Sequence, residues 1–254
     1  MAKTGRVQAI DRAIKILDCF NEDRRELRLS EISDMLDINK STVHGIISTL
    51  KFHGLIDQDE ETQKYRLGLH LMRLGDIVSN SLDIRSITSP VIDKVCKELQ
   101  ETVHIGTLDD MEVVYINKQE SNQSMRIFTT IGARNPAYCT GVGKSMLAYL
   151  DEEILMNKLP DKLNSITPKT ITDKNELLQN LTKVKLDGYA FDDEENNIGL
   201  TCVAAPIFDH SGRAKYGISV SGPTIRMTYE KINNSIKVVK EAAMEISYKL
   251  GFEK

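Results

Sequence analysis

The chain of 254 residues contains no tryptophan, and aromatic residues make up only 6% of it. No stretch approaches the roughly 18 consecutive apolar residues that a membrane-spanning helix needs. The first residues also lack the apolar core of a signal peptide. These absences predict a cytoplasmic protein with no membrane partner, and the length fits two domains.

The sequence shows no motif that is typical of a metal site or of a disulfide framework. The cysteines are scattered, show no CxxC pair and have no histidine at zinc-binding spacing, and none of the five histidines lies in an HExxH motif. We therefore expect no metal site and no cofactor, and thiols that stay reduced. The cysteines are Cys19, Cys96, Cys139 and Cys202.

Net charge also excludes a function. A formal charge of −4 argues against an indiscriminate polyanion binder, and residues 1–75 hold twelve basic and twelve acidic side chains. If this part of the chain binds DNA, its positive charge has to be arranged on one face.

The first 54 residues have apolar residues at helical spacing in three segments. The first helix is expected over 7–20, with a single buried stripe. Ser30 is a candidate N-cap for a short second helix, and Asn39 for a third over 40–53 that ends at Gly54. The stripe of the first helix consists of Val7, Ile10, Ile14, Leu17 and Cys19/Phe20.

Two short helices joined by a three-residue turn are typical of a helix-turn-helix. Segments 55–57 and 64–67 then read as strands around a polar loop, which predicts a winged helix-turn-helix over 1–68. The next helix, 69–82, is either an ordinary amphipathic helix or a linker helix that pairs with a second subunit, and we favour the linker. Its apolar positions are Leu71, Leu74, Val78 and Leu82.

From residue 83 to 254 the pattern changes to strands that meet as hairpins, with helices at the flanks. This predicts an α+β chain whose second domain is an antiparallel sheet covered by helices. Thr172 and Thr228 are expected to cap helices, and Pro90 to break one near its start. Strands are expected at 103–108, 113–118, 125–131, 200–208 and 216–221.

Two motifs invite a chemical interpretation. Gly143-Lys144-Ser145 resembles a phosphate-binding loop, but Tyr138 stands where the first glycine is needed, so only a glycine-rich turn remains. The acidic run 191–195 is by composition an ordinary solvated loop. Nothing resembles a nucleophile elbow, so we do not expect an enzyme.

Taken together, seven short stretches resemble the IclR family of transcription regulators across nearly the whole chain. Their joint order and spacing make the resemblance specific. The stretches are VQAIDRA at 7–13, KSTVH at 40–44, KYRLG at 64–68, GVGK at 141–144 after Arg134 and Pro136, GYAFDDEE at 188–195, GLTC at 199–202 and ISVSGP at 218–223.

This resemblance implies a GAF-like effector-binding domain, a homodimer or dimer of dimers, and control of a catabolic operon, for which we expect a repressor. It also implies a small carboxylate as effector. The positions that match the ligand-contacting residues of the family are Gly141, Val142, Asp192, Cys202, Ser219 and Ser221.

For double-stranded DNA, we expect Ser41, Thr42 and His44 to reach base edges, and Lys40, Lys64 and Arg66 to contact phosphates. The two-fold of a dimer predicts a pseudo-palindromic operator. Many relatives carry arginine where this chain has Gly45, so their operator sequences are not carried over.

Asp192 would repel a bound carboxylate unless it accepts a hydrogen bond from a ligand hydroxyl or is protonated by burial. We favour the hydroxyl, which points to a hydroxy acid, a sugar acid or a hydrated keto acid. Two alternatives remain open: an enzyme that uses Asp192 and Cys202 on a small molecule, and an architectural DNA-binding oligomer.

Overall fold

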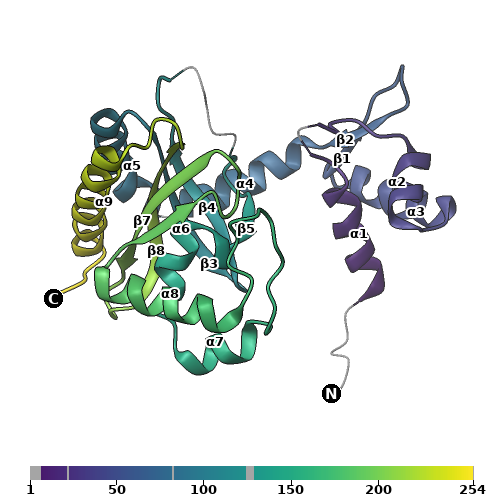
Figure 1. Ribbon diagram of the computed structural model, residues 1–254. Helices are drawn as coiled ribbons and strands as arrows, with labels where there is room; N and C mark the ends of the chain where they lie inside the picture. The colour runs from purple at the N-terminus through teal and green to yellow at the C-terminus, as the bar shows by residue number, and fades with distance from the viewer. Residues whose placement is uncertain (1–6, 22, 82, 124–128, 254) are drawn as a thin grey trace. The chain divides into compact units, whose positions relative to one another are not determined.

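The structure is a computed structural model that describes residues 7–21, 23–81, 83–123 and 129–253 (Figure 1). The chain divides into two compact units, residues 1–82 and 83–254. Each unit has its own apolar core and is described separately below.

The first unit is a helix-turn-helix with a two-stranded wing, as predicted. Strands β1 and β2 pair antiparallel, with Asp57 opposite Arg66. A left-handed residue, Asp37 (φ 51°), ends the second helix, and the Ser33 hydroxyl donates to the Ile38 carbonyl at 2.6 Å. The elements are α1 (Gln8–Asp18), α2 (Leu29–Leu36), α3 (Lys40–Phe52), β1 (Ile56–Gln58), β2 (Tyr65–Leu67) and α4 (Leu69–Ser81).

The predicted apolar stripe of the first helix is wrong at its first three positions, whereas Leu17, Cys19 and Phe20 lie in or against the core as predicted. Val7, Ile10 and Ile14 are more than half exposed within the first unit, whereas Ile16 is fully buried. The helix packs on α3 through the face that carries Ile16, and Cys19 and Phe20, which follow the helix, are buried in the same core. Spacing alone identified an apolar face, but not what it packs against.

Two predicted caps are also wrong. α2 begins at Leu29, one residue before Ser30, because the Glu31 carboxylate accepts from the Arg28 N–H at 2.6 Å. α8 is capped by Asp173, not Thr172: the Asp173 side chain accepts from the Glu176 N–H at 2.9 Å.

The second unit is a six-stranded sheet in which every neighbouring pair is antiparallel, in the order β5-β4-β3-β8-β7-β6. This confirms the predicted α+β class. The strands are β3 (Thr102–Asp109), β4 (Glu112–Gln119), β5 (Arg134–Pro136), β6 (Ala190–Asp193), β7 (Leu200–Phe208) and β8 (Ala214–Pro223).

Helices cover both faces of this sheet (Figure 1). The long helices α5 and α9 pack on each other and on one face, and the short helix α6 lies on the other face against α8. The remaining bounds are α5 (Asp83–Leu99), η1 (Ala137–Cys139), α6 (Gly141–Leu147), α7 (Glu152–Lys158), α8 (Lys174–Asp187) and α9 (Tyr229–Lys249).

Three glycines bring α6 close to the sheet. Gly106 and Gly217 are paired on β3 and β8, and a Cβ at Gly217 would lie 2.8 Å from the Val142 side chain above it. Within α6 itself, a Cβ at Gly143 would lie 2.3 Å from the Ala137 carbonyl oxygen. The first turn of α6 can therefore rest directly on β3, β7 and β8.

Some predicted elements differ in extent. α5 runs unbroken through Pro90, which lies within its first eight residues. Of the predicted strand 125–131, residues 125–128 lie outside the described residues and 129–131 are not in a strand. None of the helices in the described ranges is long and apolar enough to cross a membrane.

A buried ion cluster joins the start of β3 to the last helix. Glu101 is 1% exposed and accepts from Arg226 at 2.6 and 2.8 Å and from Lys231 at 2.6 Å. Burial acts to raise the pKa of Glu101, but the hydrogen bonds from Arg226 and Lys231 outweigh it and hold the pKa below its ordinary value.

Replacing Glu101 with glutamine is therefore expected to lower the free energy of unfolding by about 2 kcal/mol at neutral pH. A lowered carboxyl pKa stabilises the fold above the unfolded pKa of roughly 4, and this contribution is lost as the pH falls through the folded pKa. Urea unfolding of both proteins from pH 7 to pH 3 measures it, and the gap should close on acidification. Asp93→Asn, which breaks the exposed Asp93–Lys97 pair, is the control and should change stability by less than about 0.5 kcal/mol.

Candidate functional site

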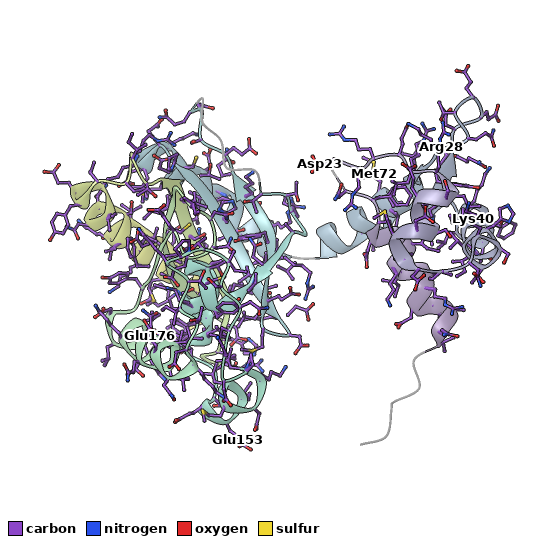
Figure 2. The ribbon with its side chains drawn as sticks, turned by 45° about the vertical axis from the view of Figure 1, so that its right-hand side comes forward. Asp23, Arg28, Lys40, Met72, Glu153 and Glu176 are labelled. Atoms are coloured by element: carbon purple, nitrogen blue, oxygen red, sulfur yellow. The ribbon has the colours of Figure 1, made fainter. Side chains whose placement is uncertain are left out.

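The first turn of α3 is the surface that a helix-turn-helix presents to DNA. Lys40, which is labelled in Figure 2, is exposed there, as are Ser41 and His44, and Thr42 is half-buried. Asn39 precedes the helix as predicted, although its side chain makes no capping hydrogen bond. Val43 and Ile47 point into the core, so the polar side chains of this turn face outward.

The wing holds its basic residues in ion pairs. Arg66 donates to the Asp57 carboxylate at 2.7 and 3.1 Å across the β1–β2 ladder, and Lys64 Nζ lies 3.8 Å from Glu26 Oε2. The hydrogen bond to Arg66 lowers the pKa of Asp57. Any phosphate contact by Arg66 has to compete with this neighbouring carboxylate.

All six residues expected to contact an effector line one small cavity of about 20 Å³ between α6 and the sheet. Adjacent strands place them together: Asp192 on β6 is opposite Cys202 on β7, which is opposite Ser221 on β8. Ser219 lies two residues along β8 and shares the same face. Gly141 and Val142 form the roof from α6.

Asp192 is the acidic group of this cavity. It is 2% exposed, and its Oδ1 accepts from the Glu195 N–H at 2.8 Å. Burial raises the pKa of the Asp192 carboxyl to about 7. The Asp192 carboxyl therefore changes its charge near neutral pH. A ligand that donates a hydrogen bond to it favours the ionised form, and an anionic ligand favours the protonated form.

His104 is one of several cavity residues that sequence reasoning missed. It is 2% exposed, neither ring nitrogen has a hydrogen-bond partner, and its ring centre lies 5.2 Å from that of Tyr115. Burial lowers the pKa of His104 to about 3, so the imidazole is neutral and offers one donor and one acceptor. The sequence around His104 gave no indication of a site, because a lone histidine in an apolar strand is usually a core residue. His104 lies opposite Ser219 only through the register of β3 and β8.

The glycine-rich turn is not a nucleotide site. Lys144 is fully buried, donates to the Phe191 carbonyl at 2.6 Å and forms an ion pair with Glu195. Its ammonium group is therefore engaged by Phe191 and Glu195 and is not free to bind a phosphate. Gly143 N–H donates to the Thr140 hydroxyl at 3.2 Å, which caps α6.

The interpretation of 191–195 as a solvated loop is wrong. Residues up to Asp193 form the edge strand β6, and both Asp192 and Glu195 are buried. Only Asp193 and Glu194 remain near the surface, where both pair with Lys169. Alternation along the strand sends neighbouring carboxylates to opposite environments, which composition could not reveal.

Comparison with known proteins gives this arrangement its context. The family described as "IclR helix-turn-helix domain" matches residues 9–60, and "Bacterial transcriptional regulator IclR C-terminal" matches residues 77–248. The chain belongs to the IclR family of transcriptional regulators.

Similar proteins cover almost the whole chain. The HTH-type transcriptional regulator XynR of Escherichia coli is 36% identical, covering 97% of this chain and 98% of its own. The transcriptional repressor IclR of the same organism is 32% identical, covering 98% and 92%. The crystal structure of Thermotoga maritima IclR has a TM-score of 0.78 and 35% identity, covering 97% and 100%.

These relatives are transcriptional regulators and not enzymes. This IclR-family chain is accordingly a DNA-binding transcriptional regulator: the helix-turn-helix binds DNA, and the C-terminal domain binds an effector. Within the ranges that the structure describes, no three His, Cys, Asp or Glu side chains are grouped to hold a metal ion.

The raised pKa of Asp192 has a measurable consequence for stability. A carboxyl whose folded pKa lies above its unfolded value favours the fold at low pH, and this contribution is lost as the pH rises towards about 7. Wild-type protein should thus lose about 3–4 kcal/mol relative to Asp192→Asn between pH 4 and pH 8, at roughly 1.4 kcal/mol per pKa unit. Urea unfolding at four pH values measures the difference, and parallel stability curves would contradict the assignment.

Gly45 gives a second prediction. It lies in the middle of α3, and a Cβ there would have no neighbour within 4 Å. Gly45→Ala should therefore raise the free energy of unfolding by about 0.5–1 kcal/mol, because alanine loses less backbone entropy in a helix. Gly143→Ala is the matched control: its Cβ meets the Ala137 carbonyl, so it should destabilise the second unit. Thermal unfolding of both variants measures the two effects.

Proposed function

We propose that this regulator is a repressor of a catabolic operon and that its effector is a small carboxylate bearing a hydroxyl group. The observation that carries the proposal is the donor-rich cavity under α6, in which one titrating carboxyl faces several hydrogen-bond donors. The identity of 32% with a transcriptional repressor supports the direction of control.

The cavity offers donors to an acidic ligand. Ser219 and Ser221 provide hydroxyls, and the neutral His104 provides one ring N–H that has no partner within the protein. The three residues lie on the neighbouring strands β3 and β8. A carboxylate placed among them would satisfy the imidazole, which is otherwise a buried polar group without a hydrogen bond.

Asp192 selects against a plain acid and for a hydroxy acid. A second anion beside an ionised Asp192 is unfavourable in a buried site, whereas a ligand hydroxyl donates to that carboxylate. The free volume of about 20 Å³ holds roughly one water molecule. The ligand therefore has only a few carbons, or the side chains around it shift on binding.

DNA binding is assigned to α3 and the wing. We infer that Ser41, Thr42 and His44 reach base edges in the major groove, while Lys40 on α3 and the wing residues Lys64 and Arg66 contact phosphates. Contacts of the first kind read sequence and those of the second set register. The exposed turn of α3 supports this division, because its polar side chains point away from the core.

We infer a homodimer or dimer of dimers, which the apolar residues that the first unit leaves exposed support. Leu69 and Met72 on α4 are 84% and 75% exposed, and Met72 is marked in Figure 2. Apolar side chains at this density on a surface helix are typical of an interface. Two such units related by a two-fold axis would require a pseudo-palindromic operator.

The proposal is tested first by gel retardation of the chain's own promoter region, with and without small hydroxy acids. Specific retardation that a hydroxy acid weakens is the expected result. Retardation that no acid changes, together with no thermal shift of the protein by any acid, would instead favour an architectural DNA-binding role. No retardation at low salt would contradict the proposal altogether.

Phosphate contacts are tested by the salt dependence of DNA affinity. Lys64→Ala and Arg66→Ala should each flatten the slope of log K against log salt by about one unit and weaken all DNA sequences alike. Lys97→Ala, which removes an exposed lysine of the second unit, is the control and should leave the slope unchanged. An unaltered slope in Lys64→Ala or Arg66→Ala would remove that residue from the phosphate contacts.

Effector recognition is tested by titration calorimetry with matched acids, lactate against propionate. Asp192→Ala should lower the affinity for lactate by about tenfold or more, because it removes the acceptor of the hydroxyl. It should leave propionate affinity unchanged or raise it, since a neighbouring negative charge is lost. Undiminished lactate affinity would contradict the assignment of the hydroxyl to Asp192.

A further inference from the structure

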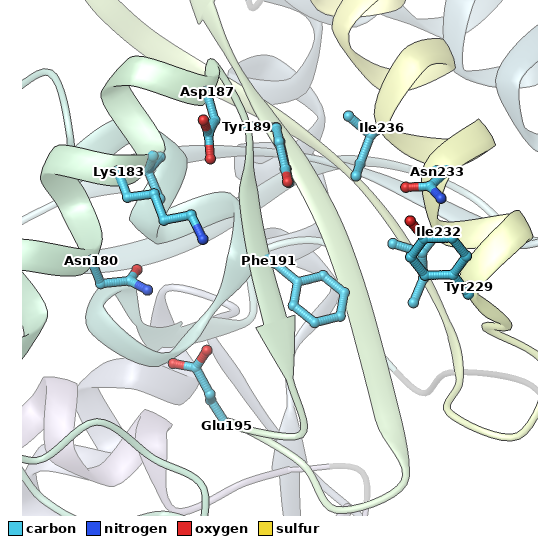
Figure 3. Close-up of a pocket in the computed structure, with 11 residues that line it drawn as sticks. Asn180, Lys183, Asp187, Tyr189, Phe191, Glu195, Tyr229, Ile232, Asn233 and Ile236 are labelled. Atoms are coloured by element: carbon cyan, nitrogen blue, oxygen red, sulfur yellow. The ribbon is translucent and has the colours of Figure 1, made fainter.

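A second and larger hollow lies on the opposite side of β6 from the effector cavity. This groove has a volume of about 490 Å³ and runs between α8 and the first turns of α9, with β6 as its floor (Figure 3). Phe191 and Glu195 line it, whereas Asp192 between them lines the cavity under α6. The two hollows are therefore distinct.

Glu195 contributes a hydrogen-bond acceptor without a partner to the groove. The residue is 7% exposed, and its Oε1 is paired with Lys144. Its Oε2 is buried and has no hydrogen-bond partner. A buried carboxylate oxygen without a donor is unfavourable, so such an atom calls for an explanation.

Asn180 supplies a second acceptor of the same kind. Its Oδ1, on α8, is also buried without a partner, and Figure 3 shows its amide on the side of the groove where Glu195 lies. Two unsatisfied acceptors at one end of a groove favour a ligand that brings donors to that end. The exposed side chain of Lys183 stands beside them, and it can move aside to admit a ligand.

The charged side chains around the groove determine which hydrogen-bond-donating group of a ligand can bind there. Glu195 is already neutralised by Lys144, and no ion pair of Lys183 is found within the described ranges of the chain. A ligand with only a positive charge would meet two ammonium groups near Glu195. A ligand with an ammonium and a carboxylate places the first on the two acceptors and the second on Lys183.

The rest of the lining is largely apolar, with Asp187, Tyr189 and Asn233 as its polar members. Phe191 lies at its centre, and Ile232 and Ile236 project from α9 with the exposed ring of Tyr229 (Figure 3). These side chains would cover a hydrocarbon or aromatic group and exclude a strongly polar one.

We propose that the groove between α8 and α9 is a second ligand site that binds an apolar α-amino acid. The ammonium group is held by Glu195 Oε2 and Asn180 Oδ1, the carboxylate by Lys183, and the apolar side chain by Phe191 and α9. The proposal does not depend on which effector the first cavity takes.

Titration calorimetry of the full chain with L-phenylalanine and L-leucine tests the site. Binding of at least one of them is expected. N-acetyl-L-phenylalanine, which lacks the ammonium, and phenethylamine, which lacks the carboxylate, should bind at least about tenfold more weakly. Absence of binding by both amino acids, or equal binding of the two truncated compounds, would overturn the proposal.

Variants then locate the binding. Lys183→Met and Asn180→Leu should each weaken amino-acid binding by about tenfold or more. Lys237→Met, an exposed lysine on α9 outside the groove, is the matched control and should bind normally. Circular dichroism checks that each variant folds. Neither Lys183 nor Asn180 belongs to the apolar core, so both variants are expected to fold.

Two outcomes would assign the groove differently. Amino-acid binding that Asp192→Asn abolishes and Lys183→Met leaves intact would place the ligand in the first cavity and overturn the proposal. Self-association in sedimentation velocity that Tyr229→Ser abolishes, without any amino-acid binding, would make the groove an interface between copies of the chain and also overturn it.

Discussion

The buried ion pair between Lys144 and Glu195 organises the effector-binding domain. Lys144 is fully buried in α6, and its partner follows the edge strand β6, so the pair joins the short helix to that edge of the sheet. Removing one partner of such a pair leaves an uncompensated buried charge, which typically costs about 3–5 kcal/mol. The position of α6 over the cavity is thereby fixed by electrostatics as well as by packing.

The same pair explains how neighbouring acidic residues acquire different roles. Lys144 uses two of its donors on Phe191 and Glu195 and leaves Asp192 without a cation in hydrogen-bond contact among the described residues. Burial then governs the pKa of Asp192. A single lysine thus pairs with one buried carboxylate, Glu195, and leaves the charge of the other, Asp192, to be set by burial.

Sequence patterns sufficed for the fold class, the helix-turn-helix and wing, and the positions of β3, β4, β7 and β8, since these follow from periodicity and turn residues. The six expected effector-contacting residues came from the family resemblance, and the strand register of β6, β7 and β8 brings them around one cavity. His104 was missed because its neighbours are set by pairing between β3 and β8. The first three positions of the predicted stripe of α1 and the acidic run were wrong for a related reason: periodicity and composition do not say what a face packs against.

The gap at Gly45 has a consequence for the bases that α3 can accept. With no side chain at Gly45 and nothing within 4 Å of a Cβ built there, the exposed surface of α3 is recessed at this position. A recess of this kind leaves room for the C5-methyl group of thymine in the major groove, while it provides no donor for the acceptors of guanine. With α3 in the major groove, as proposed above, Gly45 therefore contributes no side-chain contact to a base.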